Sequence, residues 1–511
     1  MIPILTVDRM RKIDLEAIGQ DLNTGFSYMK KAAEGLFDVA RKIVPTPRSG
    51  DIVIVCGKGN NGGDGLSLGK LLLDAGYNVM CYLLCEPDEL QRESKLAYEA
   101  YSDSQGNFLV LDDASDMVNL SNCSLIIDAL IGIGLKGELK PLYAEVIENI
   151  NSSKVPVLSV DTPSGINNDT GETGSLCVKA NFTVTMGFPK IGQYFFPARK
   201  YIGDLYIKNL GYPQNIVTKN SLNIFLPEFN DYKNMLPQRI PDGSKFEHGV
   251  VFMLSGSSGM SGSATLASNS SLRTGCGMVY LAVPKSIMNI IANKVTEVVI
   301  KPINETSQGT PSLSSLNEIT DLMEKSKAAC IGPGISHNNE TSNLVLEIVS
   351  KSNIPIVLDA DGINAFKGKK EQLKKHKSPV VITPHKGEWE RVFGEISPKP
   401  IEKIEQIRKV AVDFNISILF KGNPTIISDT KGNIYLSPYG NSGMATAGSG
   451  DVLSGIITSL IAQGCSCHDA AILGAYIHAK AGEEASKELS EYSMIASDIV
   501  NNIYKVIKRL I

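Results

Sequence analysis

Two glycine-rich stretches carry polar residues whose types and spacing could do chemistry. The first, GKGNNGGDG at 57–65, holds Asn60, Asn61 and Asp64 between a β-rich apolar run and a helix-like stretch. Glycine lets backbone approach a ligand closely, and the free N–H groups of a helix start favour anions. The stretch is neither GxGxxG nor a P-loop, so it fits neither a usual dinucleotide fingerprint nor an NTPase. A plain strand-to-helix turn capped by Asp64 is the alternative, but it gives the two asparagines no role.

Two more acidic residues stand at the ends of apolar runs in the same half. Asp128 ends the run at 124–128, and Asp161 follows the run at 155–160 and precedes TPSG. Ligands of open parallel sheets bind at the carboxyl ends of strands, so we expect Asp64, Asp128 and Asp161 at one rim of one sheet. Oxygen ligands of this kind suit a monovalent or alkaline-earth cation.

The second stretch, GMATAGSGDVLSG at 443–455, predicts an anion hole with a carboxylate at its mouth. Gly448 and Gly450 precede a predicted helix that begins near Asp451. The N–H groups of that helix start can bind phosphate. Asp451 can then take a proton from a hydroxyl while the hole stabilises charge on a leaving group. The alternative role for Asp451 is a helix cap.

Five other polar turns in this half each follow an apolar run. His385 lies in an unusual Pro-His-Lys-Gly turn, and Lys421 would direct a cation at a nucleotide phosphate. Asp359 and Asp361 could bind Mg²⁺ or cap the next helix, and the sequence leaves both open. The turns are SGSSGMSGSATLASNSSLRTGCG (255–277), GPG (332–334), DADGIN (359–364), TPHKGE (383–388) and KGNPT (421–425).

The elements that must position these residues alternate between apolar runs and helix-like stretches in both halves. The runs are continuously apolar, which is typical of parallel sheets covered on both faces. A proline-rich stretch interrupts this rhythm after residue 211. We therefore predict an α/β protein with two three-layer α/β/α domains, at 1–215 and 237–511, joined by a linker at 216–236. In the first half the runs lie at 51–56, 78–84, 124–128, 155–160 and 181–186.

Composition narrows the class of protein. The chain has 511 residues, of which 43% are apolar and 20% charged, so two packed cores are possible and global disorder is excluded. The net charge of −4 gives no support for a nucleic-acid surface. No apolar run approaches the length of a membrane span, and the N-terminus turns polar too soon for a signal peptide. The nine cysteines are scattered singly, so we expect free thiols and a cytoplasmic location.

Over roughly residues 1–215 the chain resembles the NAD(P)H-hydrate epimerase domain, because GNNGGDG, DALIGIGLKGEL and VDTPSGIN occur in that family's order and spacing. The resemblance implies a Rossmann-like fold, a catalytic acid/base at Asp161, and a potassium ion bound by Asn61, Asp128 and Ser164. Two residues depart from the family pattern: Ile133 replaces a threonine, and Thr162 an aliphatic residue. The implied substrate contacts are Asn60, Asn61, Gly62, Gly63, Asp64, Gly132, Ile133, Gly134, Leu135, Lys136, Gly137, Glu138, Tyr143 and Asp161.

Over about 237–511 the chain resembles the ribokinase-like superfamily, and within it the ADP/ATP-dependent NAD(P)H-hydrate dehydratase. TPHKGE, KGNPT and GNSGMATAGSGDVLSG carry this resemblance. It implies Asp451 as the catalytic residue, while Ser263 stands where the family usually has alanine. The implied hydrate contacts are Ser263, Ala264, Gly334, His385 and Asp451, and the implied nucleotide contacts are Lys421, Gly422, Asn423, Pro424, Thr425 and Gly450.

Together the resemblances imply a bifunctional enzyme, an isomerase and a lyase, that repairs hydrated NADH and NADPH. The first domain would interconvert the R and S hydrates, and the second would dehydrate the S form with ADP or ATP, with Mg²⁺ as a possible helper. The sequence does not decide between the two nucleotides or between the two hydrates. We expect a homo-oligomer that binds NADHX, NADPHX and an adenine nucleotide, but neither nucleic acid nor membrane.

Two alternatives stay open at this point. A small-molecule kinase of the vitamin type would also carry GxGD, although TPHKGE and the fused first domain argue against it. The first domain could instead be a nucleotide-sensing or protein-binding module without turnover. The presence of Asn61, Asp64, Asp128 and Asp161 speaks against a domain that has lost its activity.

Overall fold

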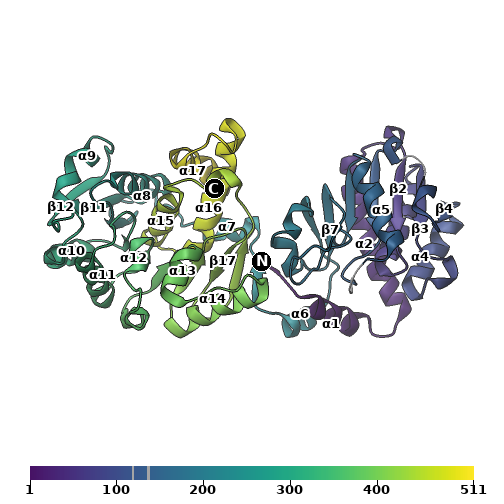
Figure 1. The fold of residues 1–511 in the computed structure, drawn as a ribbon, viewed down its shortest axis with the longest axis horizontal. Helices are drawn as coiled ribbons and strands as arrows, with labels where there is room; N and C mark the ends of the chain where they lie inside the picture. Colours follow the sequence, from purple (N-terminus) through teal and green to yellow (C-terminus); the bar gives the residue numbers. More distant parts are fainter. Residues whose placement is uncertain (118–119, 135–138) are drawn as a thin grey trace. The chain divides into compact units, whose positions relative to one another are not determined.

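The computed structural model describes residues 1–117, 120–134 and 139–511, which form two compact units (Figure 1). The N-terminal unit comprises Pro3–Leu222 with Lys399–Ile401, and the C-terminal unit comprises Met1–Ile2, Asn223–Pro398 and Glu402–Ile511. Each unit is built on one sheet. The expected linker at 216–236 contains the end of α6 (Gln214–Asn220), β9 (Ile224–Leu226) and α7 (Phe229–Met235).

The N-terminal unit contains a seven-stranded parallel sheet in the order β4-β3-β2-β5-β6-β7-β8. The predicted parallel sheet is confirmed, and β4 and β8 are strands that the apolar runs did not reveal. Its strands are β2 (Ile52–Cys56), β3 (Val79–Leu83), β4 (Asn107–Val110), β5 (Leu125–Ala129), β6 (Val157–Val160), β7 (Phe182–Met186) and β8 (Asp204–Lys208). Its helices are α1 (Val7–Ile18), α2 (Leu22–Ile43), α3 (Asn60–Asp74), α4 (Arg92–Asp103), α5 (Pro141–Ser152) and α6.

Strand β2 shows why this sheet reads as continuous apolar runs. Ile54 and Cys56 belong to the apolar cluster formed with α2, α3 and α4, whereas Val53 and Val55 pack on the opposite face with Val146 of α5. Every residue of β2 is buried. Each fully buried aliphatic side chain contributes about 1.5–3 kcal/mol, so both faces favour apolar residues and polar groups are left to the strand ends.

Helix α3 packs unusually close to this sheet, and the glycines of 57–65 make that possible. A methyl group on Gly62 would lie 1.8 Å from the carbonyl oxygen of Gly57, and one on Gly65 would lie 2.6 Å from the Cβ of Ala129. No glycine in this stretch has a left-handed φ. The glycines at these two positions therefore serve the packing of helix on strand rather than an unusual backbone conformation.

The C-terminal unit has an eleven-stranded sheet in the order β1-β9-β18-β17-β16-β15-β14-β13-β10-β11-β12, in which β17 runs antiparallel to both neighbours. Its first strand is β1 (Ile2–Pro3), and the ammonium group of Met1 lies 2.7 Å from the carboxylate of Asp231. The other strands are β9, β10 (Val250–Leu254), β11 (Met278–Pro284), β12 (Val299–Ile303), β13 (Ala328–Ile331), β14 (Ile356–Leu358), β15 (Val380–Ile382), β16 (Ser417–Phe420), β17 (Thr425–Ser428) and β18 (Ile434–Ser437).

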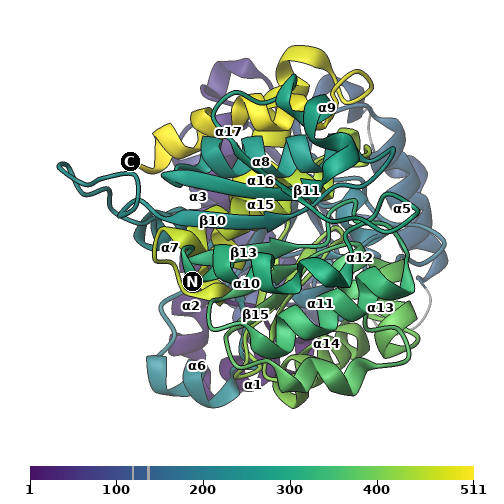
Figure 2. The same cartoon turned by 90° about the vertical axis from the view of Figure 1, so that its left-hand side faces the viewer.

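Helices cover both faces of this second sheet (Figure 2). One layer contains α8 (Ser261–Thr274), α15 (Ser449–Ala462), α16 (Cys467–Leu489) and α17 (Ala496–Leu510), and the other contains α10 (Leu316–Glu324), α11 (Asn339–Lys351) and α13 (Lys386–Phe393). Helix α15 is buried along nearly its whole length, so Asp451 lies in the first turn of a helix within the core. The remaining helices are α7, α9 (Met288–Ala292), α12 (Asp361–Asn364) and α14 (Pro400–Phe414).

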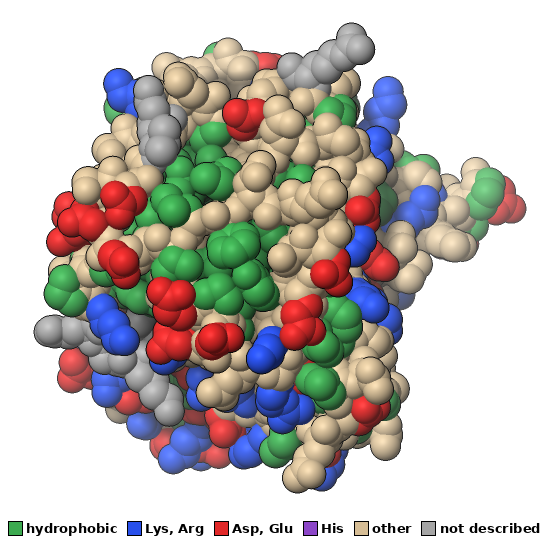
Figure 3. Space-filling model, turned by 90° about the vertical axis from the view of Figure 1, so that its right-hand side faces the viewer, with side chains coloured by type: hydrophobic (Ala, Val, Ile, Leu, Met, Phe, Trp, Pro, Cys, Tyr) green, Lys and Arg blue, Asp and Glu red, His purple; other side chains and the backbone are tan. Residues whose placement is uncertain are grey.

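Strand β4 is an exposed edge of the first sheet. Phe108 and Leu109 are 36% and 39% exposed, and Figure 3 shows apolar side chains among acidic ones on this side of the unit.

Within the ranges described above, none of the helices has both the length and the apolar composition that a membrane span requires. All nine cysteines are free thiols, as the sequence predicted.

Replacing Gly62 by alanine should destabilise the N-terminal unit. The added methyl group would force α3 away from Gly57, and overpacking of this kind costs about 1–3 kcal/mol. Gly59→Ala is the matched control, because a methyl group there meets nothing within 4 Å and a poorer helix cap costs below about 1 kcal/mol. Hydrogen exchange of the β2 amides measures both effects, and equal protection in the two variants would contradict the packing role of Gly62.

Candidate active sites

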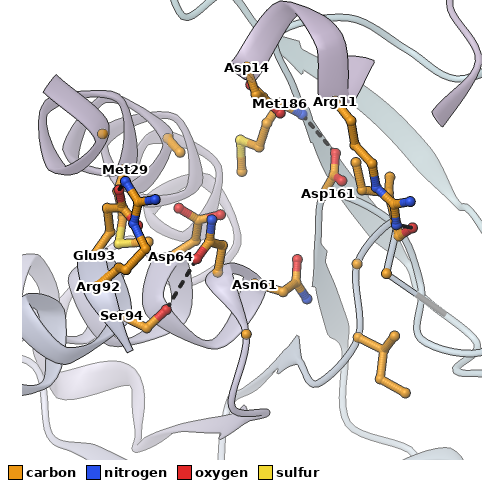
Figure 4. A pocket seen from close by; sticks show the side chains of 18 of the residues that line it. Arg11, Asp14, Met29, Asn61, Asp64, Arg92, Glu93, Ser94, Asp161 and Met186 are labelled. Carbon is orange, nitrogen blue, oxygen red and sulfur yellow. Dashed lines mark hydrogen bonds and ion pairs between the residues drawn. The ribbon is translucent and has the colours of Figure 1, made fainter. Parts of the chain in front are cut away.

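A pocket of about 1050 Å³ lies at the carboxyl ends of the strands of the N-terminal sheet (Figure 4). It brings together most of the expected substrate contacts, from α3, from the segment after β5 and from the end of β6. Gly62 and Gly63 are buried in α3 and do not line it. Leu135, Lys136, Gly137 and Glu138 lie outside the described residues. The expected residues that line the pocket are Asn60, Asn61, Asp64, Gly132, Ile133, Gly134, Tyr143 and Asp161.

Asp128 and Ser164, two of the expected potassium ligands, are in direct contact. The Asp128 carboxylate is fully buried and accepts hydrogen bonds from the Ser164 hydroxyl at 2.6 Å, the Ser164 amide at 2.9 Å and the Ser159 hydroxyl at 2.8 Å. Burial raises the pKa of Asp128, although the bonds from Ser164 and Ser159 oppose it. The Ser164 hydroxyl also lies 3.2 Å from the carbonyl oxygen of Ile131.

Asn61, the third expected ligand, lies beside Gly132, where a methyl group would be 2.8 Å from its Oδ1. Its amide nitrogen is buried without a partner among the described residues. Because the oxygen and nitrogen of a carboxamide exchange places by a simple flip, this orphaned position fits a cation that takes the oxygen. In the described part of the chain, no group of three or more His, Cys, Asp or Glu side chains could hold a metal ion.

Asp161 forms a buried ion pair that the sequence did not reveal. Its Oδ1 accepts from the Lys190 ammonium at 2.5 Å, the Thr185 hydroxyl at 3.0 Å and the Met186 amide at 3.1 Å. Lys190 is only 1% exposed. Asp161 also has a φ of +62°, which is uncommon for a residue with a side chain. The sequence signal for Lys190 was a lysine inside the apolar stretch GFPKIG.

The two departures from the family pattern have different structural outcomes. Ile133 packs beside the small apolar cluster of Leu5, Met10 and Ile13, and its carbonyl oxygen accepts a hydrogen bond from Arg11 at 3.0 Å. Its side chain therefore contacts the N-terminal helix α1. Thr162 is fully buried, and its hydroxyl has no partner among the described residues.

In the C-terminal unit, three expected hydrate contacts meet at the starts of two helices. Ser263 of α8 lies close enough to Asp451 of α15 to lower the pKa of its carboxyl group, and a methyl group on Gly334 would lie 2.8 Å from the Cβ of Ser263. Ala264 is buried next to Ser263. Burial raises the pKa of Asp451 to about 6; the charge of Asp359 adds to this effect, and the nearby Ser263 opposes it.

Lys421 and Gly450, both expected nucleotide contacts, lie around Asp359. The Lys421 ammonium is 2.5 Å from the Asp359 carboxylate, which also accepts from the Ser454 hydroxyl at 2.6 Å. A methyl group on Gly450 would lie 3.1 Å from the Lys421 ammonium. Burial alone would lower the pKa of Lys421, but the charges of Asp359 and Glu388 outweigh it and the pKa is raised. Asp359 is thus ion-paired and does not cap α12.

The remaining nucleotide contacts form the turn from β16 to β17. Gly422, Asn423 and Pro424 make up this turn, and the Thr425 hydroxyl at the start of β17 donates to the Gly422 carbonyl at 3.0 Å.

Asp361 accepts hydrogen bonds from the amide of Ser336 at 2.9 Å and from Asn364 at 3.1 Å.

His385 caps helix α13, and no interaction in the described structure joins it to Asp451. Its Nδ1 accepts from the Gly387 amide at 2.9 Å, and its Nε2 lies 3.3 Å from the buried Glu388 carboxylate. Burial raises the pKa of Glu388, with the charge of Lys421 opposing. Glu388 thus contacts His385 and also feels the charge of Lys421. The sequence did not assign it a role, although residues 385 and 388 have the spacing of a capping box.

Comparisons with known proteins agree with a two-site enzyme. A family model described as YjeF-related protein N-terminus matches residues 26–192, and one described as NAD(P)H-hydrate dehydratase matches residues 251–505. The bifunctional NAD(P)H-hydrate repair enzyme of Moorella thermoacetica is 37% identical over 464 residues, covering 90% of this chain and 88% of that one. The corresponding enzyme of Thermofilum pendens is 33% identical over 511 residues, covering 99% and 96%. The chain belongs to the family of bifunctional NAD(P)H-hydrate repair enzymes.

A solved structure is also similar to the C-terminal part. The ADP/ATP-dependent NAD(P)H-hydrate dehydratase of Bacillus subtilis, co-crystallised with ATP and Mg²⁺, is 26% identical and covers 57% of this chain and 100% of that chain. The TM-score is 0.49.

Replacing Lys190 by methionine should destabilise the N-terminal unit more than a surface change would. The substitution leaves the Asp161 carboxylate buried without its counter-charge, and breaking a buried pair in this way costs about 3–5 kcal/mol. Lys200→Met is the control, because Lys200 is exposed and such changes stay within about 0.5 kcal/mol. Urea denaturation monitored by circular dichroism measures the free energy of unfolding of both variants. A variant at position 190 as stable as the control would mean that the pair is not needed for folding.

Proposed function

We propose that this chain repairs hydrated NADH and NADPH in two steps, one in each unit. The N-terminal unit interconverts the R and S hydrates, and the C-terminal unit dehydrates the S hydrate with ADP or ATP. The observation that carries this proposal is the ion-paired Asp161 in a pocket of about 1050 Å³, in a chain that matches repair enzymes along 90% of its length. Small-molecule pockets measure about 300–1,000 Å³, so this one suits a ligand as large as a dinucleotide.

In the N-terminal unit, Asp161 acts as an acid/base at the hydrated carbon of the nicotinamide ring. The hydroxyl leaves as water while the ring nitrogen forms a double bond to that carbon, and water returns to either face. Lys190, Thr185 and the Met186 amide hold the Asp161 carboxylate in one orientation. Asn61, Asp128 and Ser164 would hold a potassium ion, which when bound would supply a positive charge at this end of the sheet.

In the C-terminal unit, Asp451 takes the proton of the ring hydroxyl as a phosphoryl group is transferred to its oxygen. The nucleotide leaves as AMP or ADP, and the phosphate now on the ring is a far better leaving group than hydroxide. The lone pair of the ring nitrogen assists the break of the carbon–oxygen bond, and a proton then leaves the neighbouring ring carbon to solvent, which restores the carbon–carbon double bond of the nicotinamide. The N–H groups at the start of α15 stabilise charge on the transferred group. Lys421, Gly450 and the turn from Gly422 to Thr425 bind the nucleotide, and Mg²⁺ would assist with its phosphates.

Further parts of the proposal concern organisation. Residues 1–215 and 237–511 are assigned to the epimerase and the dehydratase, which is supported by family matches that fall within these ranges. We also propose a homo-oligomer in the cytoplasm, and the nine free cysteines are compatible with a reducing compartment. The match along most of the chain favours the repair enzyme over a vitamin kinase or a binding module.

Asp451→Asn should abolish dehydration while leaving epimerisation intact. With a mixture of R- and S-hydrated NADH and either nucleotide, the wild-type chain should restore all of the 340 nm absorbance, whereas the variant should be about 10²–10⁴-fold slower. Asp469→Asn, a first-turn aspartate of α16, is the control that should keep its rate. Failure of the wild-type chain to restore absorbance would overturn the proposed function, and a fast variant at position 451 would overturn the role of Asp451.

The dehydration rate should also depend on pH. Asp451 accepts a proton only when ionised, and its pKa is about 6, so the rate should fall as the pH drops through 6 and reach a plateau above it. Initial dehydration rates, measured at saturating nucleotide between about pH 5 and about pH 8, give this pH dependence. A rate that rises toward acid pH would contradict the role of Asp451 as base.

A further inference from the structure

Helix α1 brings a further carboxyl group to the pocket of the N-terminal unit. Ile13 is buried in the apolar cluster with Leu5 and Met10, and the next residue, Asp14, lines the pocket. Figure 4 shows Asp14, Asp64, Asn61 and Asp161 arranged around one space. The sequence alone assigned no role to Asp14.

The Asp14 side chain is held in place by a rigid aromatic donor. Its Oδ1 accepts a hydrogen bond from the Tyr212 hydroxyl. The ring of Tyr212 stacks on Tyr28 with centroids 4.9 Å apart and on Phe188 with centroids 6.1 Å apart. A methyl group on Gly187 would lie 2.7 Å from the Tyr212 ring, so the ring occupies the space that a side chain at position 187 would fill. Tyr212 therefore fixes the carboxyl group of Asp14 within the pocket.

The charged surroundings of Asp14 differ from those of Asp161. Burial raises the pKa of Asp14 to about 6; the Tyr212 bond and the charge of Lys190 oppose this, and the charge of Asp161 adds to it. Asp161, by contrast, is paired directly with Lys190. Burial also raises the pKa of Asp64, with added effects from Asp161 and Asp14, but no hydrogen bond in the described structure fixes its carboxyl group. Two carboxyl groups in unlike environments can divide the roles of acid and base.

We propose that Asp14 is the second catalytic residue of the epimerase site and acts as the proton donor to the departing hydroxyl, opposite Asp161 as the acceptor from the returning water. This inference rests on the proposed epimerase function. It gives the helix α1 a catalytic task in addition to its packing against Ile133.

The proposed cycle balances in atoms and electrons. Asp14 gives its proton to the hydroxyl on the hydrated carbon, the carbon–oxygen bond breaks, water leaves, and the lone pair of the ring nitrogen forms a carbon–nitrogen double bond. Water then adds to the other face of the planar ring while the Asp161 carboxylate takes its proton, and the double-bond electrons return to nitrogen. Solvent carries the proton from Asp161 back to Asp14 between turnovers. The opposite epimerisation runs through the same steps in reverse.

The test uses the full-length chain and a pure R hydrate, with formation of the S hydrate followed by chromatography. Asp14→Asn should lower kcat by about 10²-fold, in the range of general acid catalysis, with KM changed little. Asp8→Asn is the matched control on the same helix, because Asp8 is exposed and its carboxylate pairs with Lys12 outside the pocket. This control should epimerise at the wild-type rate.

A second variant separates a catalytic role from a structural one. Asp14 must be protonated to act, so the wild-type rate should fall as the pH rises through about 6. The Tyr212 hydroxyl stabilises the ionised form of Asp14, so Tyr212→Phe should raise the pKa of Asp14. The rate of this variant should then fall at a higher pH than the rate of the wild type. A change in packing alone would not move the pH at which the rate falls.

The outcomes distinguish the two levels of inference. If the wild-type chain does not interconvert R and S hydrates, the proposed epimerase function fails. If the wild-type chain does interconvert them, the role of Asp14 alone fails in either of two cases: the Asp14→Asn variant keeps the wild-type kcat, or the rate of the Tyr212→Phe variant falls at the same pH as that of the wild type. A lower kcat in Asp14→Asn, together with a rate that falls at higher pH in Tyr212→Phe, supports that role.

Discussion

Burial of both sheet faces is the constraint on which the rest of this molecule depends. Strands such as β2 are apolar on both sides because helices cover both faces, and a charged group in mid-strand would lose its hydration without a partner. The functional carboxylates therefore stand where strands end or helices begin. Asp128 and Asp161 illustrate the first case, and Asp451 illustrates the second.

Both units place a lysine against a buried carboxylate, but they use the pair differently. In the N-terminal unit, Asp161 is itself the partner of Lys190 and lines the pocket. In the C-terminal unit, Lys421 is paired with Asp359, and Asp451 lies beside that pair with its own pKa raised. The first arrangement fixes a carboxylate in one orientation and neutralises its charge. The second leaves the carboxylate free to accept a proton near pH 6.

The sequence predicted what local patterns determine and missed what depends on distant contacts. Asp128, Asp161 and Asp451 follow from apolar runs and helix starts that a short window of sequence reveals. Lys190 and Asp14 reach the N-terminal site only through tertiary packing. Asp14 looks like an ordinary polar residue of its helix, and the apolar stretch around Lys190 marks the lysine as unusual but does not reveal its partner. The glycines of 57–65 were interpreted as a ligand cradle, whereas two of them are required by the close approach of α3 to the sheet.

The path of the chain through the second sheet has a consequence for how the two units are joined. Strands β1 and β9 are neighbours at one edge of the sheet of the C-terminal unit, and nearly the whole N-terminal unit lies between them in sequence. Topologically, the N-terminal unit is an insertion into the C-terminal one, entered from β1 and left toward β9. The sheet of the C-terminal unit therefore takes strands from both sides of the N-terminal unit, and a chain that began after residue 222 would lack the edge strand β1.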